Sequence, residues 1–155
     1  DLIDRLRRHP LMRAFRVDKL TYAALEATLL EHVAGRASAT VPVAAMIAMP
    51  RAAIAARAAA LADRLRGVDG LATAVVDGVS TIGGGSAPGS ALPTALLALA
   101  LAGCAPDDLL ARLRTQATPV IARIEDDRVV LDLRTVRPDE DGELAELIAS
   151  AVDSR

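Results

Sequence analysis

The sequence has almost no aromatic residues: there is no Trp, one Phe and one Tyr among 155 residues. Since 52% of the residues are hydrophobic, the chain can still form a compact core, which must be aliphatic. Stacking of nucleic-acid bases on aromatic side chains is poorly supported by this composition. The composition therefore predicts a globular domain packed from Ala, Leu, Val and Ile.

The sequence also has few cysteines, a small net charge and no long apolar run. Cys104 is the only cysteine, which excludes an internal disulfide and a multi-thiolate zinc site and favours a reducing cytoplasm. A formal net charge of -2 argues against a strong nucleic-acid binder that recognises no particular sequence. The longest apolar run, residues 91–103, is too short for a bilayer and contains Pro93. We therefore expect a soluble, cytoplasmic protein without a membrane partner.

Histidine and lysine offer little for a metal or covalent site. His9 and His32 lie far apart, and neither has another ligand at metal-binding spacing, so we expect no metal site. Lys19 is the only lysine and directly follows Asp18, a good helix N-cap. This position gives no sign of the desolvation that a Schiff-base lysine needs, so we assign Lys19 a structural role.

Hydrophobic periodicity predicts an α+β protein, with helices first and then a small antiparallel sheet covered by two helices. The helical pattern at 19–34 is apolar on nearly every side, which predicts burial against several neighbours. Residues 36–50 are expected to be a linker, and the apolar run at 92–101 fits a strand or a helix equally well. The remaining helical patterns lie at 2–9, 51–66, 105–116 and 138–152.

The clearest local signal is an antiparallel hairpin. Residues 119–124 and 128–133 alternate between apolar and polar side chains and are joined through Glu125, Asp126 and Asp127. The three acidic residues could bind a cation, but a solvated turn is the interpretation we favour.

A glycine-rich stretch, STIGGGSAPGS, covers residues 80–90. So many glycines indicate that side chains would obstruct a geometry that this stretch must adopt. It contains Gly83, Gly84, Gly85 and Ser86 but matches neither the dinucleotide-binding pattern nor a phosphate-binding loop. Two interpretations stay open: a tight connection between core segments, or a functional loop whose backbone closely approaches a ligand.

Arg13 and Arg16 form the sharpest candidate site. On one helical turn, two guanidiniums three residues apart would face the same way and could bind one anion together. A solvated basic face is the alternative in a chain with seventeen arginines.

Three segments together resemble the C-terminal part of bacterial selenocysteine synthase, the L-seryl-tRNA(Sec) selenium transferase family. They are RHPLMRAFRVDKLTYAALEATL, GGGSAPGSALPT and PVIARIEDDRVVLDLRTV. The resemblance extends from about residue 1 to residue 140, and the first and third segments are the most specific.

The resemblance implies the fold of type I pyridoxal 5'-phosphate (PLP) enzymes. Residues 1–49 would be the end of the large PLP domain and a buried connecting helix, and residues 50–155 would be the small C-terminal α+β domain. The family's PLP lysine lies in a glycine-flanked motif upstream of the matching region. Because the chain starts at Asp1 and has no such motif, we expect it to be a fragment that is inactive alone.

The implied function is conversion of seryl-tRNA(Sec) to selenocysteinyl-tRNA(Sec) with selenophosphate as donor, by a cytoplasmic homo-oligomer. Arg13 and Arg16 match a family arginine pair associated with the anionic selenium donor. The stretch from Gly83 to Ser86 matches a loop expected to form one wall of the active site, with Ala87 where Leu is usual. Arg123 is a weaker candidate, either for a substrate carboxylate or for a structural ion pair.

Two other functions stay open from the sequence. One is a related PLP-dependent lyase that acts on a small amino acid or amino-sugar acid. The other is a non-catalytic oligomerisation module, which would not require the pair formed by Arg13 and Arg16.

Overall fold

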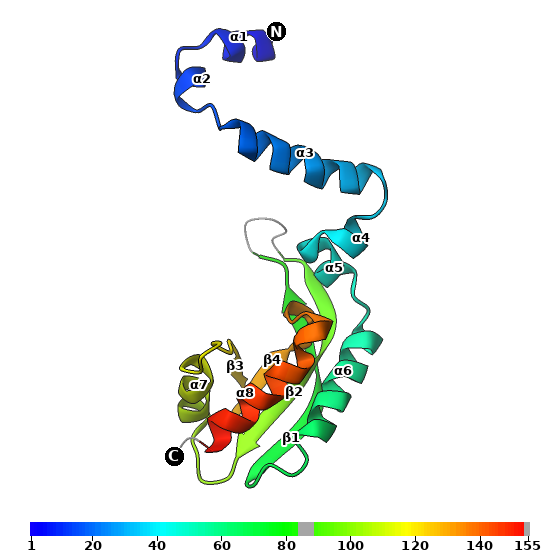
Figure 1. The fold of residues 1–155 in the computed structure, drawn as a ribbon, viewed down its shortest axis with the longest axis vertical. Coiled ribbons are helices and arrows are strands. Elements are labelled where there is room, and N and C mark those ends of the chain that lie inside the picture. The colour runs from blue at the N-terminus through cyan, green and yellow to red at the C-terminus, as the bar shows by residue number, and fades with distance from the viewer. Residues whose placement is uncertain (84–88, 154–155) are drawn as a thin grey trace. The chain divides into compact units, whose positions relative to one another are not determined.

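A computed structural model describes residues 1–83 and 89–153 of the chain (Figure 1). The described residues form two compact units, Asp1–Ala45 and Met46–Arg155. Each unit is built from elements close together in the sequence.

The first unit is helical. Asp18 begins its longest helix, accepting a hydrogen bond from the Thr21 backbone N–H at 2.8 Å, and Gly35 with φ +70° follows its end. Both boundaries agree with the sequence prediction. The linker predicted at 36–50 is wrong, because two short helices fill most of it. The helices are α1 (Leu2–Arg8), α2 (Leu11–Ala14), α3 (Lys19–Val33), α4 (Ala37–Thr40) and α5 (Pro42–Ala48), the last of which crosses into the second unit.

The long helix α3 carries apolar side chains on all sides and none of its residues is buried in this unit. Leu20 and Val33, for example, are 82% and 87% exposed. At its C-terminal end, Glu31 accepts hydrogen bonds from Arg36 and from Thr40, which join α3 to α4. The predicted burial of this helix against other parts of a larger protein stays a prediction.

The second unit contains a four-stranded antiparallel sheet in the order β1-β2-β4-β3. The predicted hairpin is confirmed, with Ile124 opposite Val129, but its first strand is shorter than predicted, because residues 119–122 lie outside β3. The undecided apolar run is a strand, since it pairs along its length with β1 and also with β4. The strands are β1 (Leu71–Thr81), β2 (Ala91–Leu101), β3 (Arg123–Glu125) and β4 (Arg128–Asp132).

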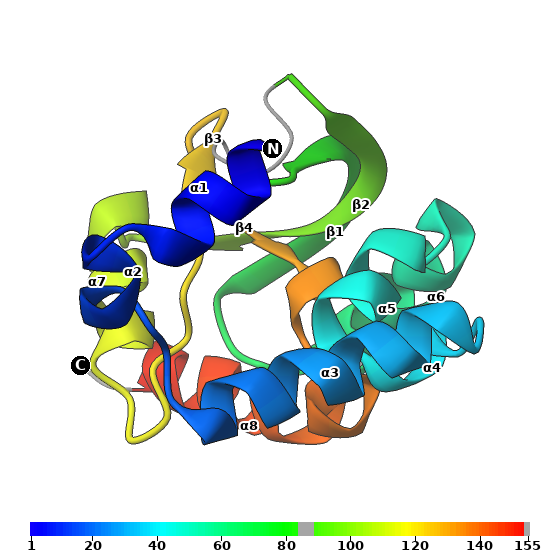
Figure 2. The same cartoon turned by 90° about the horizontal axis from the view of Figure 1, so that it is seen from above.

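Three helices cover one face of this sheet, where two were expected (Figures 1 and 2). The additional one is α6 (Arg51–Arg64), whose apolar side joins the same core as α7 (Pro106–Arg114) and α8 (Asp141–Asp153). Two 3-10 turns, η1 (Leu133–Thr135) and η2 (Pro138–Glu140), connect β4 to α8. Fully buried side chains from all these layers meet in this core: Ile54, Leu61, Leu97, Leu99, Leu109, Leu113, Val129, Leu133 and Ile148.

Within the described residues, no single helix combines the length and apolar composition needed to cross a membrane. Taken together, α5 and α6 pass the same test by length and composition, with a bend of 95° between them.

Candidate functional site

A partly buried polar network lies where β4 ends. Asp132, the last residue of β4, accepts hydrogen bonds from the Ser80 hydroxyl at 2.5 Å and the Thr94 hydroxyl at 2.9 Å. It also accepts one from the Arg134 backbone N–H at 3.0 Å, which caps the turn η1. One carboxylate therefore connects β1, β2 and the segment that follows β4.

Arg134 is the most buried charged side chain described, at 5% exposed. Its guanidinium donates to the Ser80 hydroxyl at 2.8 Å and to the Pro93 carbonyl at 2.8 Å. It also donates to the carbonyls of Met46 and Met49, each at 2.9 Å. A buried cation needs such a set of acceptors, because its desolvation is otherwise strongly unfavourable.

The strand pattern places these groups together. Val130, Asp132 and Arg134 follow one another at every second position, while Leu131 and Leu133 alternate with them and enter the main core. Leu96 lies opposite Asp132 in the β2–β4 register, which brings Thr94 within reach of the carboxylate. Strand alternation therefore accounts for Asp132, whereas Arg134 lies in the 3-10 turn η1 that Asp132 caps.

Beside this network lies a hollow of about 280 Å³, lined in part by Ser80, Thr81, Arg123 and Thr135. Arg123 donates through Nε to Glu125 at 2.6 Å, and the two side chains are 42% and 45% exposed. Arg123 thus has an ion-pair partner within its own hairpin, which agrees with one of its two predicted roles. Its role toward a substrate carboxylate stays a prediction.

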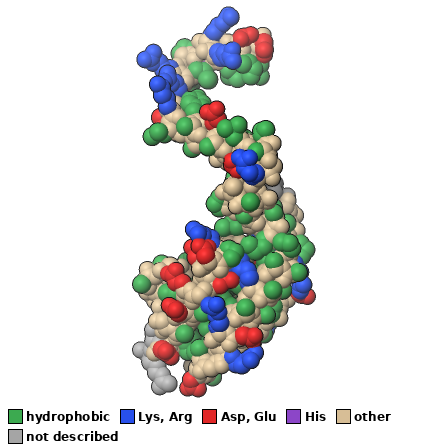
Figure 3. Space-filling model, turned by 45° about the vertical axis from the view of Figure 1, so that its right-hand side comes forward, with side chains coloured by type: hydrophobic (Ala, Val, Ile, Leu, Met, Phe, Trp, Pro, Cys, Tyr) green, Lys and Arg blue, Asp and Glu red, His purple; other side chains and the backbone are tan. Residues whose placement is uncertain are grey.

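Arg13 and Arg16 lie in the first unit, and both are exposed. Arg13 is in α2, but that helix ends at Ala14, so Arg16 lies in the link to α3. The single helical turn assumed for the pair is therefore not observed. Among the described residues neither side chain has a hydrogen-bond or ion-pair partner, and Lys and Arg side chains gather over α1 and α2 (Figure 3).

The glycine-rich stretch is described only at its ends. Gly83 lies two residues after β1, and a Cβ built on it would meet no atom within 4 Å. Gly84, Gly85 and Ser86 lie outside the described residues, so their predicted role in an active-site wall stays a prediction. Ser80, the first residue of the stretch, and Pro93, three residues after its end, both accept hydrogen bonds from Arg134.

Lys19 does not fit the covalent anchor of a PLP group. It is the first residue of α3, it is exposed, and it is the only lysine of the chain. An aldimine lysine requires a desolvated site beside other groups that hold the cofactor. Lys19 therefore lacks the surroundings that a PLP anchor needs.

Asp132 and Arg134 were not singled out from the sequence as functional or structural residues. A signal was present: two charged residues at alternate positions directly continue an apolar strand, in the segment VVLDLR. Charged side chains on a strand that is otherwise buried need partners. Those partners come from residues 38 to 88 positions away, which local pattern does not reveal.

A family model and several curated proteins match this chain, and all of them carry the same enzyme name. The family model for SelA, L-seryl-tRNA selenium transferase, matches residues 1–137. The L-seryl-tRNA(Sec) selenium transferase of Geobacter sulfurreducens is 43% identical over 141 residues, which cover 89% of this chain and 30% of that relative. The enzyme of the same name from Nitratidesulfovibrio vulgaris is 45% identical over 137 residues, covering 86% of this chain and 29% of the relative.

The chain spans about 30% of the length of these curated relatives. A third relative, from Hyphomonas neptunium, has the same name and is 39% identical over 137 residues, with 88% and 30% covered. Matches of this extent and identity, along nearly the whole described chain, agree with the resemblance carried by the three sequence segments. The chain belongs to the L-seryl-tRNA selenium transferase family.

Proposed function

We propose that this chain is the C-terminal part of a PLP-dependent transferase that converts seryl-tRNA(Sec) to selenocysteinyl-tRNA(Sec), with selenophosphate as selenium donor. The observation that carries the proposal is the family match over residues 1–137, together with relatives that bear this enzyme's name. The chain would contribute the end of the large PLP domain in residues 1–49 and the small α+β domain in residues 50–155, within a type I PLP fold.

Arg13 and Arg16 are proposed to bind the anionic selenium donor. Their support is chemical: both guanidiniums are exposed and have no partner among the described residues, so their donors are free for an external anion. The segment that contains Gly83, Gly84, Gly85 and Ser86 would form a wall of the same active site. Arg123 is the weaker candidate, because Glu125 already accepts from it.

PLP itself would be held by residues outside this chain, since Lys19 does not fit its anchor. In this proposal the chain binds the selenium donor and forms one wall of the active site. Residues elsewhere in the protein bind the cofactor. This division agrees with the share of the relatives' length that the chain covers.

We propose that the complete protein is a cytoplasmic homo-oligomer that works without a membrane partner. The exposed apolar side chains of α3, among them Leu20, Leu25, Leu29 and Val33, support assembly, because water-exposed apolar surface of this extent usually covers an interface. They are equally compatible with burial in the rest of the same subunit.

Two alternatives are distinguished by activity. A PLP-dependent lyase would act on a small amino acid or amino-sugar acid and would not require tRNA. An oligomerisation module would transfer no selenium, and replacing Arg13 and Arg16 would then change no catalytic activity.

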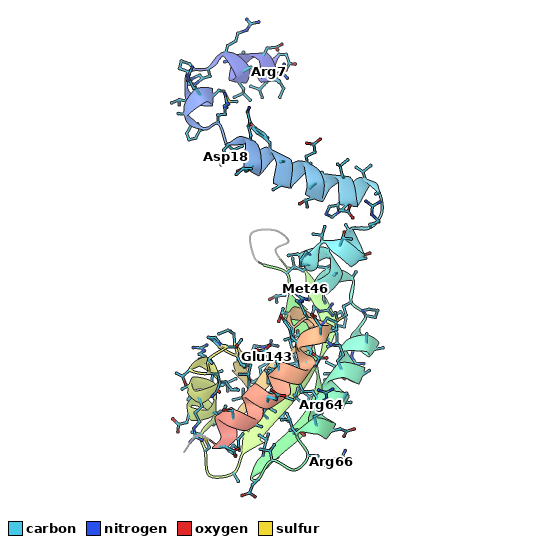
Figure 4. The ribbon with its side chains drawn as sticks, in the orientation of Figure 1. Arg7, Asp18, Met46, Arg64, Arg66 and Glu143 are labelled. Carbon is cyan, nitrogen blue, oxygen red and sulfur yellow. The ribbon has the colours of Figure 1, made fainter. Side chains whose placement is uncertain are left out.

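The experiment is made in the full-length protein that contains this chain. The double substitution Arg13→Ala with Arg16→Ala should abolish selenium transfer to seryl-tRNA(Sec) while PLP absorbance stays unchanged, because donor binding is lost and the cofactor site is intact. A matched control, Arg7→Ala with Arg8→Ala, removes the same charge from α1 (Figure 4) and should keep most of the activity. Normal transfer by the first variant would refute the assigned role.

A further inference from the structure

Arg134 joins both described ends of the connection between β1 and β2. Ser80 is the penultimate residue of β1 and Pro93 the third of β2, and in the register they lie one pair apart. The guanidinium donates to the Ser80 hydroxyl and to the Pro93 carbonyl, each at 2.8 Å. One rigid planar group therefore sets how these two strand ends lie relative to each other.

The same guanidinium fixes the start of the second unit. Its Nη1 donates to the carbonyls of Met46 and Met49, which lie before α6 (Met46 is labelled in Figure 4). Four acceptors, three of them backbone carbonyls, thus surround one side chain that is 5% exposed. Four of the five N–H donors of this guanidinium are thereby used, three of them on backbone carbonyls, which is the pattern of a side chain that holds backbone in place.

Ser80 links the guanidinium of Arg134 to the carboxylate of Asp132. Its hydroxyl accepts from Arg134 Nε and donates to Asp132, so it connects the cation to the carboxylate in one chain of hydrogen bonds. Thr94 adds a second hydroxyl to the same carboxylate. A simple strand end would need none of these groups, and an apolar residue at position 80 would leave Asp132 and Arg134 each short of a partner.

We propose that Arg134, Asp132 and Ser80 are positioning residues for selenium transfer. They hold the last residues of β1 and the first of β2, and with them Gly83, in the geometry that the reaction requires. This inference rests on the proposed function, in which Gly83 belongs to a wall of the active site. Enzymatic rates depend steeply on such geometry, and a displacement of about 1 Å can lower a rate by about a hundredfold.

The test uses the full-length enzyme with Ser80→Ala and its conservative partner Ser80→Thr. Ser80→Ala should lower kcat about tenfold and leave KM for selenophosphate within about twofold, because the wall shifts while the donor-binding arginines are untouched. Ser80→Thr keeps the hydroxyl and should restore most of kcat. Arg134→Lys, which keeps the charge but loses the planar fork, should be at least as impaired as Ser80→Ala.

A core variant separates positioning from general destabilisation. Ile148 is fully buried in α8, and its apolar side chain cannot take part in the hydrogen bonds of the network, so Ile148→Val should lower stability without changing kcat. Amide hydrogen exchange provides a second readout: Ser80→Ala should speed exchange around residues 79–83 and 91–94, and Ile148→Val should not.

Three outcomes overturn the inference. If Ser80→Ala keeps wild-type kcat in an active enzyme, or if Ile148→Val lowers kcat equally, the network has only a structural role. If the wild-type protein transfers no selenium to seryl-tRNA(Sec), the proposed function fails and the positioning role fails with it. The exchange data then still report whether the network holds the strand ends.

Discussion

Replacing Gly78 in β1 by alanine should destabilise the second unit, although alanine is normally the better residue inside a strand. A Cβ built on Gly78 would lie 2.5 Å from Leu96 Cδ1 and 2.6 Å from Leu96 Cγ. Leu96 is fully buried and packs with Ala98 and Val130 on the face of the sheet opposite the three helices. Since Cγ is a branch point, a rotation of the far methyl groups cannot relieve the contact.

Two effects of opposite sign decide the magnitude. Removing the freedom of glycine from the unfolded chain would stabilise the protein by about 0.4 to 1 kcal/mol. Forcing an additional methyl group into a filled space destabilises by about 1 to 3 kcal/mol, because a neighbouring side chain must leave its rotamer. The contact distances to Leu96 place this site toward the severe end, so we expect a net loss of about 1 to 2 kcal/mol.

The assay is urea unfolding of the 155-residue chain, compared with Gly67→Ala as a matched control. A Cβ at Gly67 would meet no atom within 4 Å, and Gly67 is not among the glycines with positive φ. Its replacement should therefore be neutral or slightly stabilising. If Gly78→Ala were as stable as Gly67→Ala, Leu96 would not occupy the space over Gly78 and the packing argument for this face would be refuted.

Two further predictions concern a helix cap and a partly buried ion pair. The Thr21 backbone N–H lowers the pKa of Asp18, so this cap stabilises α3 above the ordinary Asp pKa and is lost as pH falls through the folded value. NMR of the Thr21 amide should show this acid transition in the wild type and not in Asp18→Asn. Arg57→Met should lower the free energy of unfolding by about 3 kcal/mol, because it leaves Asp141 without its partner at 2.6 Å. A loss below about 1 kcal/mol in urea unfolding would contradict this expectation.

The sequence pattern predicted a structural element correctly where the residues that determine it lie within a few positions of one another. Asp18 and Gly35 delimit α3 because capping and a left-handed residue act on the adjacent turn. The β3–β4 hairpin follows from alternation and from an acidic turn in which Asp126 and Asp127 both have positive φ. The α+β order of elements could therefore be predicted before any long-range contact was known.

The elements that the sequence pattern left undecided or predicted wrongly depend mostly on contacts between residues far apart in the sequence. The run 91–101 is apolar at nearly every position, so only its pairing with β1 and β4 makes it a strand. In 36–50, Pro42 suits the first turn of a helix, and the alanines around it favour continuation, a signal that the linker interpretation overlooked. The network of Asp132 and Arg134 depends on partners from three other segments and is visible only once the sheet is assembled.

The arginines of this chain differ in how many of their N–H donors already bind acceptors within the protein. This difference determines which of them can bind a substrate directly. Arg134 already donates four of its five N–H groups to acceptors inside the second unit, so an external anion could bind it bidentately only by displacing bonds that hold the strands in place. Arg13 and Arg16 have no acceptor among the described residues, so binding an anion would break no bond within that part of the chain. Substitution at Arg13 and Arg16 should therefore act on donor affinity, whereas loss of the Arg134 network should act on turnover at saturating donor.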